Sequence, residues 1–434
     1  MSIENNSTIE QSGNMPKGGE QSIPKGWVET TLGEVVSKII DYRGKTPKKL
    51  GENWSINGKY RALSAKSVKT GGLTNLDQIN RVNEILYKKW MKDEIQLNDI
   101  LMTSEAPMGE VLLWKTDEKI VLSQRLFALR AKDDVSPNYL YYYFISRKFE
   151  FELKARASGT TVVGIRQTEL KKTKIVIPPL LEQKAIAQIL TAFDDKIELL
   201  QDQNKTLETT AQTIFKEWFG KYQIGDELPE GWRVGKLGEE FNITIGRTPP
   251  RKEKEWFSNT PIGKKWISIK DIGNSGAYIS NTAEYLTNKA IERFNIPIIP
   301  KNTTILSFKM TVGKLTITTE DMLSNEAIAH LKLKQNTVLS SEFIYLYLQD
   351  LDFNALGSTS SIVTAINSTM IKYLEFLMPE KNILLQFDEL IKPIFDKIYN
   401  NTTQIQTLKQ TRDTLLPKLM SGQLRVDEFK EGAI

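Results

Sequence analysis

The chain has no cysteine and only one histidine, His330, among its 434 residues. Without cysteine it can form no disulfide, no iron–sulfur cluster and no thiol nucleophile. A structural zinc site needs several Cys or His ligands, so that class is excluded, and a catalytic zinc site is nearly so. A serine triad or an HNH-type nuclease would have to be built around His330. The composition therefore argues against most metal-dependent and nucleophilic enzymes.

Long apolar runs are also missing: none approaches the roughly 20 residues that a membrane-spanning helix needs. The N-terminus lacks the basic start and apolar core of a secretory signal. We therefore expect a cytoplasmic protein with no membrane partner. Hydrophobic residues make up 40% and charged residues 26%, which is ordinary for a globular protein. The length favours two or three domains.

The net charge of +5 is spread unevenly along the chain. Residues 24–179 hold 27 Lys and Arg against 18 Asp and Glu, whereas residues 223–379 hold 17 of each. A basic surface attracts phosphate backbones. An ordinary lysine-rich surface would explain the same excess, so the charge alone leaves both interpretations open.

The sequence contains an internal duplication with an offset of about 200 residues, which must be recognised before the fold is assigned. Pro24-Lys25-Gly26-Trp27 returns as Pro229-Glu230-Gly231-Trp232, and Gly44-Lys45-Thr46-Pro47 returns as Gly246-Arg247-Thr248-Pro249. Further pairs keep the same order along both copies: Leu32 with Leu237, Ser64 with Ser268, Lys66 with Lys270, Gly109 with Gly313, Tyr141 with Tyr345, Tyr143 with Tyr347, and Asp195 with Asp396.

Each copy consists of a block of short β-type runs with Gly and Pro breaks, followed by a long helical pattern. The predicted fold class is α+β: two similar mixed α/β globular domains in tandem, each followed by a long helix, the two helices forming an antiparallel coiled coil with pseudo-two-fold symmetry. The predicted segments are a disordered N-terminal tail (1–23), a first mixed domain (24–179), a first helix (180–222), a second mixed domain (223–379), a second helix (380–426) and a C-terminal tail (427–434).

The helices carry an apolar seam with alternating steps of four and three residues. The first seam reads Ile186, Leu190, Phe193, Ile197, Leu200, Asn204, Leu207, Ala211, Ile214 and Trp218. The second reads Phe387, Ile391, Ile394, Ile398, Asn401, Ile405, Leu408, Arg412, Leu415 and Leu419. At ~1.5 Å per residue each seam is about 50 Å long. The seams favour a mutual coiled coil over the alternative of two helices that each lie on their own domain.

The polar breaks in the seams indicate the orientation of the pair. An antiparallel pairing places Asn204 opposite Asn401, where two buried amides can hydrogen-bond and fix the register. A parallel pairing would place Asn204 against Ile405 and leave a polar group unpaired. We therefore predict antiparallel helices with the two asparagines in contact. Pro393 should kink the first turns of the second helix, and Pro417 should bend its end.

Several motifs resemble a known family. They are the Pro-x-Gly-Trp openings followed by Leu-Gly-Glu, the Gly-x-Thr-Pro turns, the string Ile177-Pro178-Pro179-Leu180-x-Glu182-Gln183, and the ending Leu415-Leu416-Pro417-Lys418-Leu419-Met420-Ser421-Gly422-Gln423-Leu424. Over residues 24–426 the chain resembles the specificity (S) subunit of type I restriction–modification systems. The second linker, Met378-Pro379-Glu380, departs from the first, which leaves the start of the second helix near Pro393 open.

The resemblance implies that the mixed domains and the long helices have different roles. The two mixed domains would be target recognition domains that each read one half of an asymmetric, bipartite sequence in double-stranded DNA. The two helices would be spacers that set the gap and dock two methyltransferase (M) subunits, which restriction/translocase (R) subunits join. The S subunit would itself be non-catalytic and bind no metal or cofactor, with S-adenosylmethionine, Mg and ATP held by the partner subunits.

The residues offer no catalytic motif of their own. Neither Pro-Pro pair, at 178–179 or at 249–250, lies in the Asn/Asp-Pro-Pro-aromatic motif that holds a flipped adenine. Gly44-Lys45-Thr46 lacks the upstream glycine of a phosphate-binding loop. Two alternatives stay open: a self-sufficient endonuclease and a free-standing DNA-binding adaptor.

Candidate DNA contacts are side chains that can reach base edges or phosphates. The Gly-x-Thr turns suit a phosphate, although a turn that merely packs is an equal alternative, and Arg125 and Asn325 are expected at nearly equivalent positions. Tyr141, Tyr143, Tyr345 and Tyr347 are expected in the core. The candidates are Lys45, Thr46, Arg61, Ser64, Lys66, Arg125, Ser158, Gly159, Thr160, Thr161 and Arg166 in the first half, and Arg247, Thr248, Lys270, Lys309, Lys314, Asn325, Ser358, Thr359 and Ser360 in the second.

Overall fold

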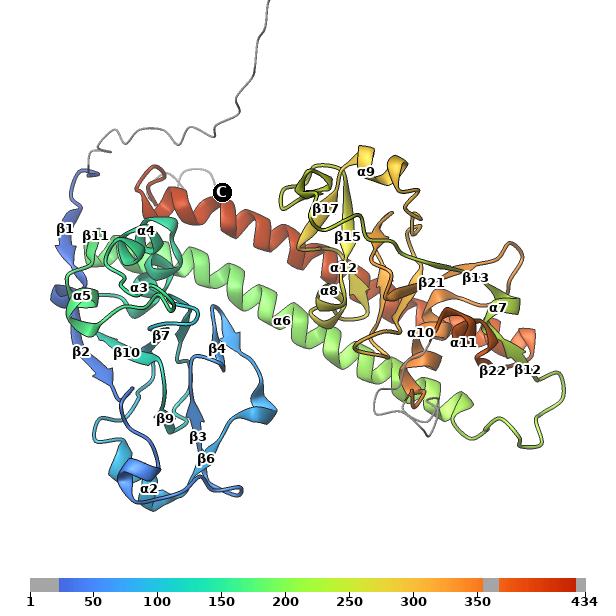
Figure 1. Cartoon of the computed structure of the whole chain (residues 1–434), viewed down its shortest axis with the longest axis horizontal. Coiled ribbons are helices and arrows are strands. Elements are labelled where there is room, and N and C mark those ends of the chain that lie inside the picture. Colours follow the sequence, from blue (N-terminus) through green and yellow to red (C-terminus); the bar gives the residue numbers. More distant parts are fainter. Residues whose placement is uncertain (1–22, 354–366, 427–434) are drawn as a thin grey trace, which may run out of the picture. The chain divides into compact units, whose positions relative to one another are not determined.

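The computed structural model describes residues 23–353 and 367–426 (Figure 1). Its contacts divide the chain into two compact units. The first unit combines the residues up to Ala192 with those from Arg412 onward, and the second runs from Phe193 to Thr411. The first unit is therefore discontinuous in sequence, whereas the second is continuous.

The first unit is built around a four-stranded sheet with the order β2-β10-β7-β8. Its strands are β1 (Val28–Thr31), β2 (Val36–Asp41), β3 (Tyr60–Leu63), β4 (Val68–Lys69), β5 (Gly72–Leu73), β6 (Arg81–Val82), β7 (Ile100–Thr103), β8 (Val111–Leu113), β9 (Ile120–Leu122), β10 (Leu126–Ala131) and β11 (Lys174–Ile177). Its short helices are α1 (Leu32–Val35), α2 (Glu84–Trp90), α3 (Pro137–Ile145), α4 (Arg147–Ala155) and α5 (Gln167–Lys171), with 3-10 turns η1 (Lys48–Leu50) and η2 (Leu76–Gln78).

Both faces of this central sheet are buried, because its side chains alternate between two apolar clusters. Met102 and Phe127 face a cluster that includes the tyrosines of α3 and the ends of the long helices. Leu101 and Ala128 face the opposite cluster, which contains Trp90 of α2. The sheet thus separates a layer of helices from a distal lobe that carries β3, β6, β9 and α2.

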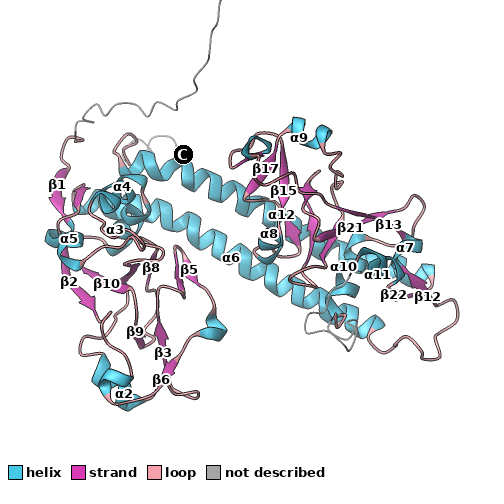
Figure 2. Cartoon of the chain, in the orientation of Figure 1, coloured by secondary structure: helices cyan, strands magenta, loops and turns pink. Residues whose placement is uncertain are grey.

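The second unit repeats this plan around a five-stranded sheet with the order β13-β21-β18-β19-β16. Its strands are β12 (Arg233–Lys236), β13 (Phe241–Ile245), β14 (Phe257–Ser258), β15 (Lys264–Ile267), β16 (Tyr278–Ile279), β17 (Glu284–Leu286), β18 (Thr304–Ser307), β19 (Leu315–Thr318), β20 (Leu323–Ser324), β21 (Ile328–Leu333) and β22 (Glu375–Met378). Its short helices are α7 (Leu237–Glu240), α8 (Ile269–Gly273), α9 (Asn288–Arg293), α10 (Ser341–Asp350) and α11 (Ser368–Tyr373), with a 3-10 turn η3 (Lys254–Trp256) (Figure 2).

The duplication predicted from the sequence is confirmed by matching strand pairs. β3 runs parallel to β9, with Leu63 opposite Leu122, and β15 runs parallel to β20, with Ile267 opposite Ser324. In each unit the first strand also pairs antiparallel with the last, β1 with β11 and β12 with β22. The predicted fold of two similar mixed domains, each followed by a long helix, is therefore correct, and the expected core tyrosines of α3 are buried.

The two long helices are α6 (Leu180–Phe219) and α12 (Lys381–Met420), each of 40 residues. α12 begins well before Pro393 and remains helical through both Pro393 and Pro417, so neither proline ends it. Both prolines are exposed, where water can satisfy the carbonyls that lose a donor. Within the described residues, no helix is both long and apolar enough to cross a membrane.

Within the second unit, α6 and α12 run antiparallel. Asn401 donates from Nδ2 to Asn204 Oδ1 at 2.8 Å and to Gln203 Oε1 at 2.8 Å. Further along α6, Phe219 packs its ring 4.8 Å from that of Phe387, which lies nearer the start of α12. The pair of asparagines expected from the sequence is therefore present, with Asn401 only 1% exposed.

Within the first unit, the start of α6 meets the end of α12. Ile186 and Leu190 share an apolar cluster with Leu419 and Met420. Just beyond the helix, Arg425 donates from Nη2 to Glu182 Oε2 at 3.0 Å. The same carboxylate oxygen accepts from the Trp27 indole at 3.1 Å, so Glu182 joins Trp27 to Arg425 within the first unit.

Candidate nucleic-acid interface

Three loops of the first unit meet beside the central sheet. Ser104, which follows β7, donates from its backbone N to Arg125 O at 2.8 Å, and its own carbonyl accepts from Ile165 N at 3.0 Å. The next residue, Glu105, forms an ion pair with Arg125 at 3.0 Å. The fold thus gathers the predicted residue Arg125 and the segment that ends at Ile165.

That segment contains four of the predicted residues. Ser158 and Gly164 exchange two backbone hydrogen bonds, of 2.9 and 3.0 Å, which close a tight loop around Ser158, Gly159, Thr160 and Thr161. Gly159 has φ +119°, and a Cβ there would lie 2.1 Å from a carbonyl oxygen, so only glycine fits. All four predicted residues are exposed, as is Arg166 at the start of α5.

The end of β3 lies beside the same group of loops. Ala65 donates to Gln124 O at 3.1 Å, which brings Ser64 and Lys66 next to the residue before Arg125. Lys66 is exposed, and within the described residues its ammonium has no hydrogen-bond or ion-pair partner. Arg61, at the other end of β3, is instead held by Glu118 through a hydrogen bond of 2.8 Å from Nε.

The polar groups of the Gly-Lys-Thr turn, residues 44–46, bind other residues of the first unit. Lys45 donates from Nζ to Trp90 O at 2.5 Å, and its ammonium lies 4.1 Å from the centre of the Tyr42 ring. Burial lowers the pKa of Lys45. Thr46 accepts from Lys49 N at 3.3 Å. These contacts favour the packing alternative for this turn.

The Gly-Arg-Thr turn of the second unit is held more tightly. A Cβ on Gly246 would lie 2.2 Å from Ser324 O. Arg247 donates from Nη1 to Phe294 O at 3.1 Å, and Thr248 donates to the Glu326 carboxylate. The polar groups of this turn are therefore engaged within the domain as well.

The remaining described candidates of the second unit differ in their availability. Lys270 on α8, and Lys309 and Lys314 between β18 and β19, are exposed. Asn325 is occupied, because its Oδ1 accepts from Ala327 N at 3.0 Å. Ser358, Thr359 and Ser360 lie outside the described residues.

The expected equivalence of Arg125 and Asn325 is wrong by two residues. Arg125 O accepts from Ser104 N at 2.8 Å, and the matching bond of the second unit runs from Phe308 N to Ala327 O at 2.9 Å. Ser123 donates to Leu63 O, and Asn325 donates to Ile267 O in the same way. Arg125 therefore corresponds to Ala327, and Asn325 to Ser123.

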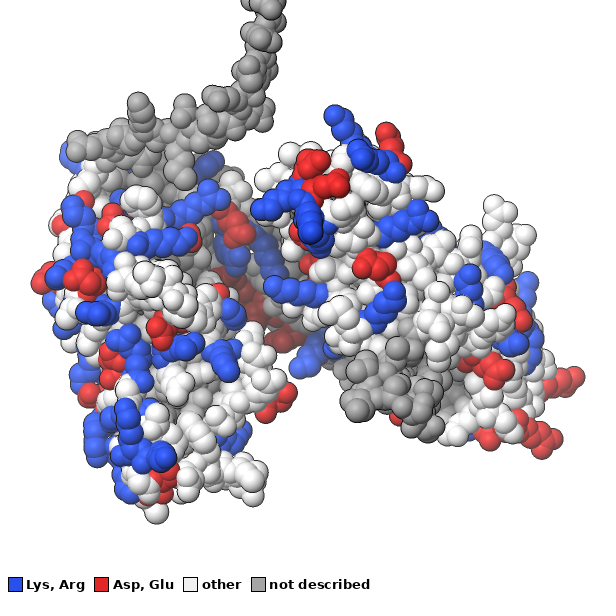
Figure 3. Space-filling model, viewed as in Figure 1, with Lys and Arg blue, Asp and Glu red and all other residues white. Residues whose placement is uncertain are grey.

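The basic excess of the first domain is visible around α2, where Lys and Arg side chains gather in Figure 3. The exposed lysines on α2 and close to it in sequence or on η1 are Lys48, Lys49, Lys88, Lys89 and Lys92. Two of them are partly neutralised, because Lys88 pairs with Glu84 at 3.2 Å and Lys89 with Glu52 at 2.6 Å. The others leave a cationic surface that suits phosphate contacts.

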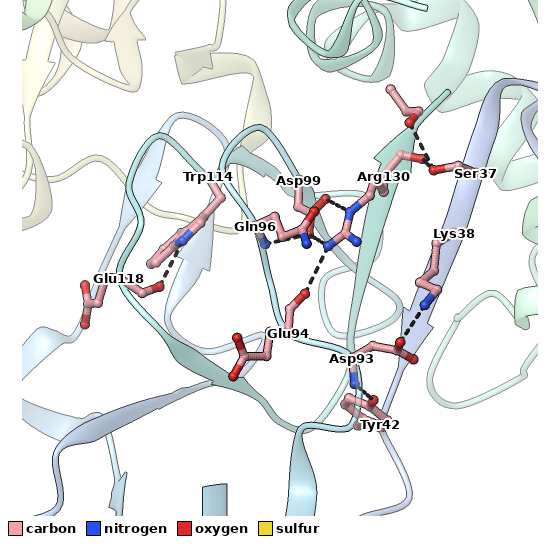
Figure 4. Close-up of polar contacts among 11 residues, drawn as sticks. Ser37, Lys38, Tyr42, Asp93, Glu94, Gln96, Asp99, Trp114, Glu118 and Arg130 are labelled. Carbon is pink, nitrogen blue, oxygen red and sulfur yellow. Dashed lines mark hydrogen bonds and ion pairs between the residues drawn. The ribbon is translucent and has the colours of Figure 1, made fainter. Parts of the chain in front are cut away.

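An ion pair between a half-buried arginine and a buried aspartate, not anticipated from the sequence, anchors the lobe to the sheet (Figure 4). Arg130 on β10 binds both carboxylate oxygens of Asp99 at 2.8 Å, and Asp99 also accepts from Gln96 N at 2.8 Å. Asp99 is 1% exposed, and its carboxylate raises the pKa of Arg130. The pair fixes the segment that leads into β7 and hence into the loops described above.

The single histidine is part of the fold. His330 accepts or donates through Nδ1 to Thr244 Oγ1 at 2.9 Å and through Nε2 to Ser324 Oγ at 2.7 Å. His330 and Ser324 are fully buried, and burial lowers the pKa of His330 to about 3. The Ser–His contact therefore has no access to a substrate. Across 23–353 and 367–426, no group of His, Cys, Asp and Glu could hold a metal ion.

Comparison with known proteins agrees with this architecture. The model of the type I restriction modification DNA specificity domain matches residues 24–209 and again residues 229–412. The MjaIX specificity subunit of a type I restriction enzyme from Methanocaldococcus jannaschii is 29% identical over 348 residues, 76% of this chain and 78% of that protein. The MjaVIII specificity subunit of the same organism is 24% identical over 425 residues, 93% of this chain and 94% of that protein.

A solved structure shares the fold over nearly the whole length. The crystal structure of the S subunit of a type I restriction–modification system from M. genitalium has a TM-score of 0.54 and 18% identity, and the match covers 91% of this chain and 96% of that chain. With the repeated domain model and the two matched units, the chain belongs to the type I restriction modification DNA specificity domain family, and carries two copies of its domain.

Proposed function

We propose that this chain is the non-catalytic specificity subunit of a type I restriction–modification complex. Its two mixed domains would each read one half of an asymmetric, bipartite sequence in double-stranded DNA. The observation that carries this proposal is that two domains of one fold differ in the side chains at matched loop positions. Arg125 corresponds to Ala327, for example, so the same scaffold would read different bases.

The surface chemistry supports contact with DNA. In the first domain, Arg125, Arg166, Lys66 and the exposed loop 158–161 lie on neighbouring loops. Cations contact phosphates, and guanidinium, hydroxyl and amide groups can read base edges. In the second domain, Lys270, Lys309 and Lys314 offer similar groups.

We assign the spacing of the two half-sites, and the docking of two methyltransferase subunits, to α6 and α12. The hydrogen-bonded amides of Asn204 and Asn401 support a fixed register between these helices. Restriction/translocase subunits would join through the methyltransferase subunits. S-adenosylmethionine, Mg and ATP would be bound by those partners, and the complex would act on DNA in the cytoplasm.

Methylation mapping tests the proposal. The chain is co-expressed with a type I methyltransferase subunit from the same organism, and methylated adenines in the host DNA are mapped. We expect one bipartite, asymmetric motif. Exchanging residues 223–379 for those of a relative should change one half of the motif and keep the other. A single continuous motif, or a change in both halves, would contradict the proposal.

The chain alone, incubated with Mg²⁺ and plasmid DNA, tests the two alternatives. We expect no cleavage. Cleavage would establish a self-sufficient endonuclease, and failure of any methyltransferase subunit to co-purify would favour a free-standing adaptor.

A further inference from the structure

Hydrogen bonds of the Ser307 side chain hold together the loop between β18 and β19. The Ser307 hydroxyl donates to Thr311 O at 2.6 Å and accepts from Lys314 N at 3.0 Å. Gly313 N donates to Ser307 O at 2.9 Å. A single buried hydroxyl at the end of the strand therefore organises the whole turn, which we call the Ser307 loop (residues 308–314).

The first unit contains the same set of hydrogen bonds between β7 and β8, with Thr103 in place of Ser307. The Thr103 hydroxyl donates to Pro107 O at 2.6 Å and accepts from Glu110 N at 2.9 Å. Gly109 N donates to Thr103 O at 2.9 Å. This Thr103 loop (residues 104–110) has the hydrogen bonds of the Ser307 loop at the same positions, so the side chains of the two loops can be compared one by one.

The tip residues of both loops are held in a left-handed conformation. Ala106 has φ +48° and Met310 has φ +61°. Non-glycine residues seldom adopt such angles, and they are found where the surrounding structure imposes them, often at functional sites. Met310 is also 92% exposed. A long apolar side chain is thus held out into water on a rigid tip, an arrangement suited to contact with another molecule.

The charges beside the two tips are opposite. Lys309 and Lys314 flank Met310, and both are exposed. The matched positions of the Thr103 loop hold Glu105 and Glu110. Both carboxylates are neutralised within the domain, Glu105 by Arg125 at 3.0 Å and Glu110 by Lys69 at 3.2 Å. One loop therefore presents two cations and an apolar tip, whereas the other presents a methyl group between paired charges.

We propose that the Ser307 loop is the base-contacting element of the second domain and that position 310 determines specificity there. Lys309 and Lys314 bind phosphates on either side of the loop. The side chain of Met310 then lies against base edges in the groove, where apolar groups recognise features such as the thymine methyl group. This inference rests on the proposed function, and it names a residue through which the second half-site is read.

Methylation mapping with Met310→Ala is the first test. The full chain is co-expressed with its methyltransferase subunit, as above. We expect the motif to relax by about tenfold in preference at one base pair of one half-site, the lower end of what one base pair contributes to specificity, with the other half unchanged. Ile262→Ala, at another exposed apolar residue of the second unit (61% exposed), serves as the control and should leave the motif intact.

The outcomes distinguish a failure of the proposed function from a failure of the assignment of Met310. If the wild-type complex yields no bipartite motif, the proposed function fails. If the wild type yields one and Met310→Ala leaves it unchanged, or Ile262→Ala relaxes it equally, the assignment of position 310 fails while the proposed function stands. Because Met310 is exposed, its replacement should not alter the thermal midpoint of the chain.

Salt dependence tests the two lysines. The affinity of the same complex for a duplex carrying the mapped motif is measured by anisotropy at increasing salt. Lys309→Gln combined with Lys314→Gln should reduce the slope of log K against log salt by about two, because each phosphate contact contributes roughly 0.9. Lys221→Gln with Lys372→Gln, at two exposed lysines of the second unit outside the long helices, removes the same charge and should keep the slope. Equal slopes in both double variants would overturn the phosphate contacts.

Discussion

The amide pair between α6 and α12 can be tested by a double-mutant cycle. Asn401 is 1% exposed and donates two hydrogen bonds of 2.8 Å, to Asn204 and Gln203. Each such bond stabilises the folded state by about 1 kcal/mol net. Asn401→Leu should therefore lose about 2 kcal/mol, because it also leaves the Asn204 carbonyl without its partner. Asn204→Leu should lose a similar amount, because the buried Asn401 amide loses one acceptor.

The double variant should behave differently from the sum of the two single variants. With leucine at both positions the seam becomes continuously apolar at this level and no asparagine amide is left unpaired. Gln203 Oε1 loses its donor, but Gln203 is exposed and can bond to water. We expect the double variant to lose only about 1 kcal/mol, for the hydrogen bond to Gln203, and hence a coupling energy of about 3 kcal/mol, at the upper end of what contacting residues show. The register would then be less strictly specified, since a polar pair in a seam fixes alignment at a cost in stability.

Calorimetry of the full chain measures the effect. For a unit of this size, 1 kcal/mol shifts the midpoint by about 2–4 °C, so each single variant should melt about 4–8 °C lower. Asn400→Leu, at the exposed neighbouring position, is the control and should melt near the wild type. If the double variant loses the sum of the two single losses, the asparagines do not interact and the reasoning is refuted.

Three further predictions concern single side chains, each followed by calorimetry or NMR. Gly246→Ala should destabilise the chain by about 1–3 kcal/mol, because its Cβ would lie 2.2 Å from Ser324 O, whereas Gly44→Ala, with open space around it, should be tolerated; equal losses would contradict this. Asp99→Ala should cost about 2 kcal/mol, because the half-buried Arg130 loses two charge-assisted hydrogen bonds and keeps only the bond to Glu94 O, whereas Asp93→Ala breaks an exposed pair and should cost little; a much smaller loss for Asp99 would show that water replaces its carboxylate. His330, as the single histidine, gives one set of imidazole signals, which should not titrate between pH 8 and 5, since burial lowers its pKa to about 3; a midpoint near 6.5 would show that the ring reaches water.

The same histidine has a predictable effect on stability. Its folded pKa of about 3 lies below its value in the unfolded chain, so the unfolded state binds more protons between these two values. This group therefore lowers the stability as the pH falls from about 6.5 towards 3. Above that range it has no effect on the pH dependence.

The features that the sequence predicted correctly depend on residue spacings along the chain and on repeated motifs. The seam of α6 and α12 repeats every three and four residues, so the helices and the contact between Asn204 and Asn401 could be inferred. Paired motifs such as Gly109 and Gly313 revealed the duplication, because they keep their order along both copies.

The features that were missed depend on contacts between distant segments. Lys45 donates a hydrogen bond to Trp90 O and Arg247 donates one to Phe294 O, so both are less available to contact DNA. Neither partner is apparent from the Gly-x-Thr motif. The match of Arg125 to Ala327 follows a two-residue change of offset near β9 and β20, which only hydrogen bonds could place. Thr103 and Ser307 could have been matched from the sequence, since each lies six residues before a matched glycine. That their hydroxyls hold equivalent loops is seen only from the hydrogen bonds.

The junction at Glu182 has a consequence for synthesis on the ribosome. The first unit needs Leu419, Met420 and Arg425 to complete its apolar cluster and its ion pair, yet these residues are translated after the whole of the second unit. The second unit is continuous in sequence and can finish folding while the first still waits for its final segment. Nascent chains that stall before Leu419 would therefore present the open cluster around Ile186 and Leu190 to chaperones and proteases.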